Sequence, residues 1–225
     1  MSIAAQSDFA AQRQTMVDCQ IRTFDVTDQV VIDRFLAVPR ERFLPDHLQA
    51  LAYSDAALEI RAAQETRVLL APLVLARMMQ GAGVAATDRV LDVAGAAGYS
   101  AALLAGLAND VVSLESDAGL SAQAAANFAA SGIANAHAVT GSLDAAGVAG
   151  TFDLIFINGA VEAGLEPLLA KLSLGGRLIA IQMIAGHAGK VTRFEKIGGE
   201  TSRRVLFNAA APVLHAFAAR QAFVF

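Results

Sequence analysis

The most constraining feature of this sequence is an alternation, after residue 85, of short apolar runs with alanine-rich stretches of helical length. Strands that alternate with helices in this way are typical of βαβ units, which build a parallel sheet. A run such as Leu-Ile-Phe-Ile at residues 154–157 has no polar alternation, as expected for a strand that is covered on both faces. The predicted strands are residues 89–94, 110–115, 136–141, 152–158 and 176–182, and the predicted helices are 99–108, 119–131, 164–172 and a short one near 143–148.

The region before residue 85 has a different pattern, with apolar residues at helical spacing between residues 8 and 80. The segment 38–45 interrupts it, because proline disfavours a helical conformation in the residue before it. Pro72 suits the first turn of a helix that runs to about residue 80 and is followed by Gly81 and Gly83.

These patterns predict a chain with two parts. Residues 1–84 are expected to form a helical N-terminal region packed on the sheet, and residues 85–225 an open α/β domain, together making one structural unit. Two further β-like stretches, 205–210 and 218–225, have no clear helix between them, which predicts an antiparallel hairpin at one sheet edge.

Composition excludes several other classes of protein. The mean hydropathy is high, at +0.48, but a spanning helix needs about 20 consecutive apolar residues and no such stretch occurs. The net charge of −4 argues against a non-specific nucleic-acid binder. The start of the chain lacks the pattern of a secretory signal, and the single cysteine, Cys19, agrees with a reducing compartment, so we expect a cytoplasmic protein.

Candidate ligand-binding residues follow the first two predicted strands of the α/β domain. In such a sheet, ligands bind beyond the carboxyl ends of the strands. The first strand carries Asp92 and ends in the turn Ala94-Gly95-Ala-Ala-Gly98, which leads into a helix whose N-terminus offers free N–H groups. The next strand ends at Glu115, about 20 residues after Gly95, where an acid can accept hydrogen bonds from the ribose of a nucleoside cofactor.

Simpler interpretations of these residues remain open. Gly95 and Gly98 also suit a tight turn without a ligand, and Glu115 also suits a solvated acid at a strand end. The unpaired burial of a carboxylate is costly, so Asp92 within an apolar strand is expected to have a specific partner. The four histidines show no ligand spacing with each other or with acids, so no metal site is expected.

Several segments resemble the protein-L-isoaspartate O-methyltransferase family. They are Met-Val-Asp-Cys-Gln-Ile-Arg at residues 16–22, Val-Pro-Arg-Glu-Arg-Phe-Leu-Pro at 38–45 and Ala-Tyr-Ser-Asp at 52–55, and the similarity continues through 90–99, Glu115, 152–155 and 174–178. The resemblance implies a Rossmann-like class I methyltransferase fold, S-adenosylmethionine as cofactor, and a protein or peptide carboxylate as substrate. It also implies cofactor contacts for Asp92, Ala94, Gly95, Gly98, Glu115 and Ser142, with Glu115 on the ribose and Ser142 near the adenine.

The sequence departs from the pattern of that family at three places. The substrate loop of the family reads approximately Gly-Gln-Thr-Ile-Ser-Gln-Pro, whereas residues 66–72 place Leu70 at the hydroxyl position and Ala71 at the glutamine position. In the cofactor turn, Ala94 and Ala96 stand where the family has glycine. Ser142 stands where the family has an aspartate.

Three functional hypotheses follow from this comparison. The first is an S-adenosylmethionine-dependent methyltransferase that acts on a carboxylate or another acceptor, with isoaspartyl recognition lost because the loop lacks its hydroxyl residue. The second is a catalytically silent relative that acts as a binding or scaffold module. The third, a nicotinamide-dependent oxidoreductase, rests only on the glycine turn and Glu115 and lacks the full dinucleotide fingerprint. None of them assigns a catalytic residue or an oligomeric state.

Overall fold

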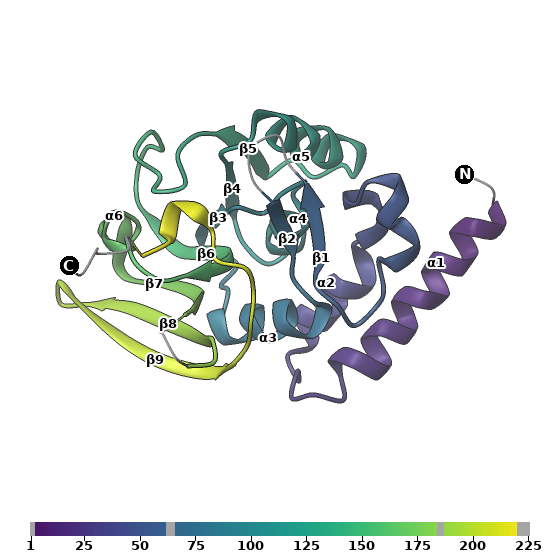
Figure 1. Ribbon diagram of the computed structural model, residues 1–225, viewed down its shortest axis with the longest axis horizontal. Helices are drawn as coiled ribbons and strands as arrows, with labels where there is room; N and C mark the ends of the chain where they lie inside the picture. Colours follow the sequence, from purple (N-terminus) through teal and green to yellow (C-terminus); the bar gives the residue numbers. More distant parts are fainter. Residues whose placement is uncertain (1–2, 62–65, 184–186, 220–225) are drawn as a thin grey trace, which may run out of the picture.

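The computed structural model describes residues 3–61, 66–183 and 187–219, and this part of the chain contains a seven-stranded sheet. Its strands are β3 (Arg89–Val93), β4 (Asp110–Glu115), β5 (Ala136–Thr140), β6 (Phe152–Val161), β7 (Leu172–Gln182), β8 (Lys190–Ile197) and β9 (Glu200–Asn208). The order across the sheet is β5-β4-β3-β6-β7-β8-β9, as Figure 1 shows. The first five strands in this order are parallel, β8 is antiparallel to β7, and β9 is antiparallel to β8. The predicted α/β sheet with an antiparallel edge is therefore confirmed.

The α-helices of the described residues form before and between these strands, and shorter helical turns occur at Val17–Ile21, Arg40–Phe43, Asp46–Leu51 and His215–Phe217. The α-helices are α1 (Ile3–Met16), α2 (Gln29–Ala37), α3 (Pro72–Ala82), α4 (Tyr99–Ala105), α5 (Ala118–Ala130) and the short α6 (Glu166–Ala170). As predicted, α3 begins at Pro72, and Gly83 ends it in the left-handed conformation that glycine adopts without strain. Gly81, which was expected to follow the helix, lies within it. The side chain of Asp117 caps α5 by accepting a hydrogen bond from the Leu120 N–H, 2.9 Å away.

The two faces of the sheet bury two separate hydrophobic clusters. In β6, Leu154 and Phe156 point to the cluster shared with α3, α4, α5 and the N-terminal region, whereas Ile155 and Ile157 point to the other face. Both sets are fully buried. This burial on both faces explains why the strand sequences are apolar without alternation.

The helix expected near residues 143–148 is wrong, because this segment forms turns. It still buries Leu143, Ala145 and Val148 against the second face of the sheet. Asp144 Oδ1 accepts a hydrogen bond from the Ala146 N–H at 2.9 Å, and Ala145 has a positive φ of 59°. This local aspartate turn satisfies the backbone in place of a helix.

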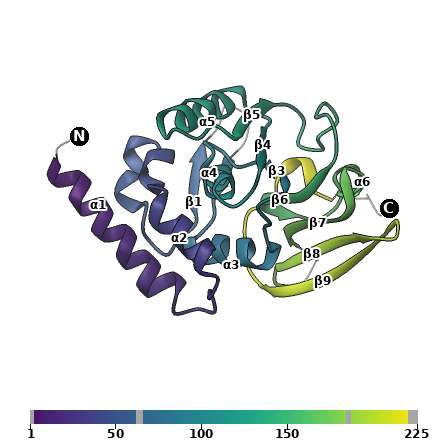
Figure 2. The same cartoon turned by 180° about the vertical axis from the view of Figure 1, so that it is seen from behind.

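The edge hairpin is confirmed, but its strands are not the two that the sequence suggested. The observed pair is β8 with β9, which covers most of the predicted stretch 205–210. The other predicted stretch, 218–225, is not a strand at residues 218–219, and its remainder lies outside the described residues. The hairpin and α1 lie at opposite ends of the molecule (Figure 1 and Figure 2).

The N-terminal region is mostly helical but contains a small antiparallel hairpin that the helical pattern did not predict. It consists of β1 (Leu58–Arg61) and β2 (Thr66–Leu69), which form a two-stranded sheet of their own. In β1 the side chains alternate, with Leu58 and Ile60 buried and Glu59 and Arg61 exposed. Four residues are too few for this period of two to stand out in a helical region.

The N-terminal region packs on α4 of the sheet domain through aromatic and basic side chains. Phe43 and Phe35 make edge contacts with the ring of Tyr99, with ring centroids 5.5 and 6.4 Å apart, respectively. Arg40 is fully buried, stacks over the same ring, and donates hydrogen bonds of 2.8 Å to the carbonyls of Ala52 and Leu70. No helix among the described residues is long and apolar enough to cross a membrane.

We propose that residues 1–84 and 85–225 unfold as one cooperative unit, because one hydrophobic cluster contains residues from both. The substitution Phe43→Ala is expected to destabilise the protein by about 3–5 kcal/mol while keeping a single unfolding transition. Urea unfolding followed by circular dichroism measures both. Phe24→Ala is the matched control, because Phe24 is 54% exposed and its loss should cost less than about 0.5 kcal/mol. Two separate transitions in the wild type would contradict the proposal.

Candidate functional site

The candidate site lies where β3 and β4 end side by side. These strands are parallel neighbours, with Val93 opposite Leu114, so the turn at residues 94–98 and Glu115 come to the same edge of the sheet. The Ala94 N–H continues the ladder by donating to the Leu114 carbonyl at 2.9 Å. The structure therefore brings together five of the proposed cofactor residues, Asp92, Ala94, Gly95, Gly98 and Glu115, and their contact with a cofactor stays a prediction.

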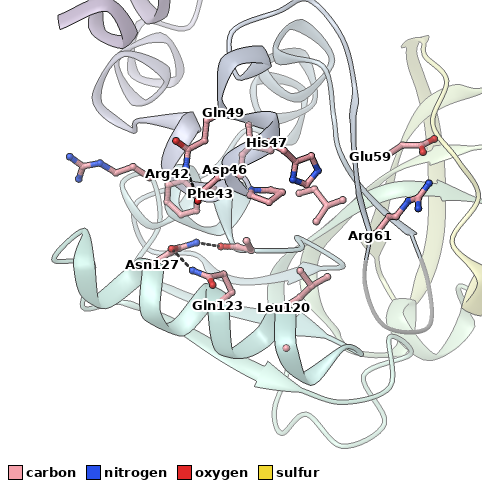
Figure 3. Close-up of a pocket in the computed structure, with 15 residues that line it drawn as sticks. Arg42, Phe43, Asp46, His47, Gln49, Glu59, Arg61, Leu120, Gln123 and Asn127 are labelled. Atoms are coloured by element: carbon pink, nitrogen blue, oxygen red, sulfur yellow. Dashed lines mark hydrogen bonds between the residues drawn. The ribbon is translucent and has the colours of Figure 1, made fainter. Parts of the chain in front are cut away.

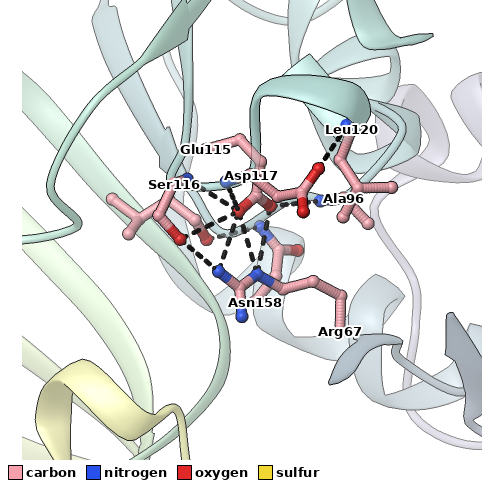
Figure 4. A network of polar contacts seen from close by, with 8 residues as sticks. Arg67, Ala96, Glu115, Ser116, Asp117, Leu120 and Asn158 are labelled. Atoms are coloured by element: carbon pink, nitrogen blue, oxygen red, sulfur yellow. Dashed lines mark hydrogen bonds and ion pairs between the residues drawn. The ribbon is translucent and has the colours of Figure 1, made fainter. Parts of the chain in front are cut away.

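Glu115 is not a solvated acid, because its side chain is 1% exposed and is paired with Arg67 of β2. The Arg67 Nε donates to Glu115 Oε1 and Oε2 at 3.0 and 3.1 Å, and Nη2 donates to Oε1 at 2.8 Å. Nη2 also donates to Ser116 Oγ at 2.6 Å. Figure 4 shows the guanidinium facing the carboxylate, and the Arg67 side chain is itself 0% exposed.

Backbone N–H groups complete the environment of the Glu115 carboxylate. Ser116 and Asp117 donate to Oε1 at 2.7 and 3.3 Å, and Ala96 donates to Oε2 at 3.3 Å. A buried carboxylate is stable only when charge and hydrogen bonds compensate it. Both kinds of compensation are present here, so the acid is fully engaged within the protein.

The turn at residues 94–98 has the backbone of a glycine-rich turn although two of its residues are alanine. Ala94, Ala96 and Gly98 all have positive φ angles, of 58°, 53° and 91°. The left-handed region costs an alanine roughly 1–2 kcal/mol because of its Cβ. The chain therefore holds the turn in this conformation at the expense of local strain.

The two glycines of the turn have packing reasons that need no ligand. A Cβ on Gly95 would lie 2.3 Å from Asp92 Oδ2, and one on Gly98 would lie 2.7 Å from the ring of Phe128. Contacts within the protein are thus sufficient to explain both glycines as parts of a tight turn.

Asp92 has the specific partners that its place in an apolar strand predicted. It is fully buried, and its two oxygens accept hydrogen bonds of 2.8 Å from Asn158 Nδ2 and from Ser100 Oγ. Burial raises the pKa of this carboxyl to about 7, with a further increase from the negative charge of Glu115, and the two hydrogen bonds oppose the rise. Asp92 therefore binds a proton more readily than an ordinary aspartate.

Ser142 lies in the loop that follows the neighbouring strand β5, two residues after its end at Thr140. Thr140 pairs with Glu115, and the Gly141 N–H donates to the Glu115 carbonyl at 2.9 Å, so Ser142 follows at the same edge of the sheet. Its side chain is exposed, unlike the residues of the turn. Its contact with an adenine stays a prediction.

A cavity of about 610 Å³ lies beside the turn but does not reach the acid. Figure 3 shows it between the segment that carries Arg42 and His47, strand β1 and helix α5. Its lining includes Ala97 of the turn but neither Asp92 nor Glu115. The candidate cofactor residues and this cavity are therefore separate features.

The loop that precedes α3 is apolar at the positions where the sequence resemblance expected polar groups. Leu70 is 2% exposed and belongs to the core, and its carbonyl accepts the hydrogen bond from Arg40. Ala71 precedes the first turn of α3 and offers no side-chain cap. Neither residue presents a hydroxyl or an amide to a substrate.

The parallel order of β5-β4-β3-β6-β7, the antiparallel edge and the acid at the end of β4 define a Rossmann-like fold of the class I methyltransferases. A solved structure of a protein-L-isoaspartate O-methyltransferase superposes with a TM-score of 0.79 at 23% identity over 90% of this chain, which spans 65% of that structure's length. A structure of the same description from Plasmodium falciparum, in complex with S-adenosyl-L-homocysteine, superposes with a TM-score of 0.75 at 18% identity, covering 91% of this chain and 98% of that one.

Sequence relatives identify the family within this class. Residues 11–210 match the sequence profile of the family protein-L-isoaspartate(D-aspartate) O-methyltransferase. Protein-L-isoaspartate O-methyltransferase 1 of Rhodopseudomonas palustris (strain HaA2) is 34% identical over 77% of this chain and 70% of its own length. The enzyme of Koribacter versatilis (strain Ellin345) is 32% identical over 82% of this chain and 86% of its own length. The chain belongs to this family, whose enzyme type is the carboxyl O-methyltransferase that uses S-adenosylmethionine, and the nicotinamide hypothesis has no further support.

The types of residue at this edge of the sheet are those that bind a nucleoside cofactor, but one contact conflicts with such binding. An acid, Glu115, ends β4, and a turn of small residues follows β3, which are the places where S-adenosylmethionine would be held in this fold. The conflict is Arg67, which engages the acid that a ribose would need. The residues therefore fit the cofactor only in a conformation in which Arg67 has left Glu115.

The sequence prediction missed Arg67, as it missed Asn158 and Ser100, the partners of Asp92. The strand of Arg67 is short, its partner is 48 residues away, and an arginine in an alternating segment is usually solvent-exposed. One feature of the sequence could have indicated Arg67. It stands in the substrate loop at a position where the family pattern has a glutamine. The described residues contain no group of three or more histidine, cysteine or acidic side chains that could hold a metal.

We expect Asp92→Asn to flatten the dependence of stability on pH. Because the native carboxyl has a pKa of about 7 and an unfolded aspartate titrates near its ordinary value, the native state binds the extra proton between these two pH values. The contribution of this group to stability therefore falls as pH rises through that window, by an amount on the order of a few kcal/mol. Urea unfolding between pH 5 and about pH 8 measures the slope, and an unchanged slope in the variant would contradict the assignment.

We also expect Ala96→Gly to leave the stability unchanged or to raise it by up to about 1 kcal/mol, because glycine relieves the strain at positive φ but loses more entropy on folding. The matched control is Ala101→Gly, a fully buried alanine within α4. It should cost roughly 1 kcal/mol or more, because glycine is unfavourable inside a helix. Thermal unfolding of the two variants gives the comparison, and an equal loss in both would mean that the turn is not strained.

Proposed function

We propose that this protein is an S-adenosylmethionine-dependent methyltransferase that acts on a carboxylate or another acceptor and does not recognise isoaspartyl residues in the manner of its family. Family membership supports the cofactor and the reaction type. The observation that carries the proposal is the position of Glu115 beside the turn at residues 94–98, at the edge where such folds bind a nucleoside. The buried Leu70 supports the change of acceptor.

The proposed roles of the residues follow from their positions. Glu115 would accept hydrogen bonds from the ribose hydroxyls, the turn at 94–98 would face the methionine part, and Ser142 would approach the adenine. Asp92 orders the turn through Ser100 and Asn158. Bound S-adenosylmethionine supplies an electrophilic methyl group. A carboxylate acceptor is already ionised at neutral pH, so the protein's main task is to position it, and no general base is required.

The second candidate function is a catalytically silent binding module, and two observations favour it. Arg67 engages the acid, and Ala94 and Ala96 add methyl groups to the cofactor turn. Calorimetric titration of the wild-type protein with S-adenosyl-L-homocysteine separates the two candidates. Saturable binding supports the methyltransferase, and no binding at millimolar concentration would support the silent module.

We expect no transfer of labelled methyl groups to an isoaspartyl peptide above the level of a heat-treated sample. The physical reason is that a site discriminates through its polar partners, and neither Leu70 nor Ala71 provides one. The Rhodopseudomonas palustris relative serves as the positive control. Turnover of the peptide by the wild-type chain would refute the loss of isoaspartyl recognition.

A further inference from the structure

The ion pair between Arg67 and Glu115 leaves the acid without capacity for a ligand. A carboxylate has about four lone-pair positions, and it gains most from a bidentate guanidinium. Arg67 supplies that bidentate contact, and the N–H groups of Ala96, Ser116 and Asp117 supply three more donors. A pair of ribose hydroxyls can therefore reach Glu115 only by replacing Arg67.

Arg67 belongs to an element that is separate from the main sheet. Strand β2 pairs only with β1 among the described residues, in a two-stranded sheet outside the seven-stranded one. No ladder hydrogen bond therefore ties its backbone to β4, and the side chain alone makes the contact with Glu115. The hairpin itself stays anchored, because Leu58, Ile60, Val68 and Leu69 are buried in the hydrophobic cluster that it shares with the sheet. Movement of the Arg67 side chain alone frees the acid without breaking the sheet.

We propose that Arg67 is an internal competitor of the cofactor and sets the affinity of the site by occupying the ribose-binding acid. This inference rests on the proposed function. In the closed state the guanidinium compensates the buried charge of Glu115, and in the open state the hydroxyls of the nucleoside and the three backbone N–H groups bind it. Because only the open state accepts the ligand, the measured dissociation constant exceeds the intrinsic one by the inverse of the open fraction.

The chemistry of the contact identifies the part of the ligand that competes. A vicinal diol donates two hydrogen bonds to one carboxylate and so matches what the guanidinium donates. A nucleoside that lacks both hydroxyls has nothing to exchange for Arg67. The competition is therefore specific for ligands with 2′- and 3′-hydroxyl groups.

The test is the substitution Arg67→Gln, which removes the guanidinium. Calorimetry with S-adenosyl-L-homocysteine and with adenosine should show roughly tenfold or greater tightening relative to the wild type, and 2′,3′-dideoxyadenosine should show no gain. Arg61→Gln is the matched control, because Arg61 is an exposed arginine on the other strand of the same hairpin, and it should bind like the wild type. The double variant Arg67→Gln with Glu115→Gln should lose the gain.

The outcomes distinguish the inference from the function on which it rests. Equal affinity of the wild type and Arg67→Gln would overturn the competition and leave the proposed function standing. Absence of binding in both would overturn the proposed function itself. Tightening that extends equally to the dideoxynucleoside would overturn the role of the diol.

A measurement on the wild type covers the case in which Arg67→Gln does not fold. The Nε–H of a buried, paired arginine exchanges slowly with water, so its nuclear magnetic resonance signal is observable, and Arg67→Lys identifies it by the loss of that signal. Saturation with S-adenosyl-L-homocysteine should shift or remove the Arg67 signal. An unchanged signal at saturation would overturn the inference, and failure to saturate would contradict the proposed function.

Discussion

The candidate site depends on how this chain compensates one buried negative charge. Glu115 ends a strand in the middle of the molecule, where an unpaired carboxylate would destabilise the fold by several kcal/mol. Arg67 provides the opposite charge from a hairpin far away in the sequence, and three backbone N–H groups provide the remaining contacts. The same acid that the fold offers to a nucleoside is thus also one of the points at which the hairpin contacts the sheet domain.

The sheet could be predicted from the sequence because its physical signal is local. Strands that are covered on both faces are continuous apolar runs, and β4 was predicted with its observed bounds. The segment 143–148 was less informative, because its apolar residues are buried by turns rather than by a helix. Hairpin β1–β2 was missed because its strands are four residues each. Local patterns therefore identify long or fully buried elements better than short ones.

The candidate site was only partly predictable, because its charges are compensated over long sequence distances. The residues of the turn and Glu115 follow from strand ends, which the sequence marks. Their partners do not, since Arg67 reaches Glu115 across 48 positions and Asn158 reaches Asp92 across 66. The reason for the glycine at position 95 was also not predictable from the local sequence. Gly95 is required by the position of the Asp92 side chain, a contact that a motif of small residues does not contain.

The arrangement of charges at this edge explains why an exchange of Arg67 for a neutral ligand is physically accessible. Removal of the guanidinium does not leave Glu115 bare, because the N–H groups of Ala96, Ser116 and Asp117 come from the backbone of the turn and of the strand end. The second carboxyl, on Asp92, has a pKa of about 7, raised in part by the charge of Glu115, so it takes up a proton readily when the local negative potential increases. Two carboxyl groups at one edge then need not both be charged when the arginine leaves. The backbone N–H groups and the Asp92 carboxyl, which are already in place in the closed state, thus limit the electrostatic cost of moving Arg67 away from Glu115.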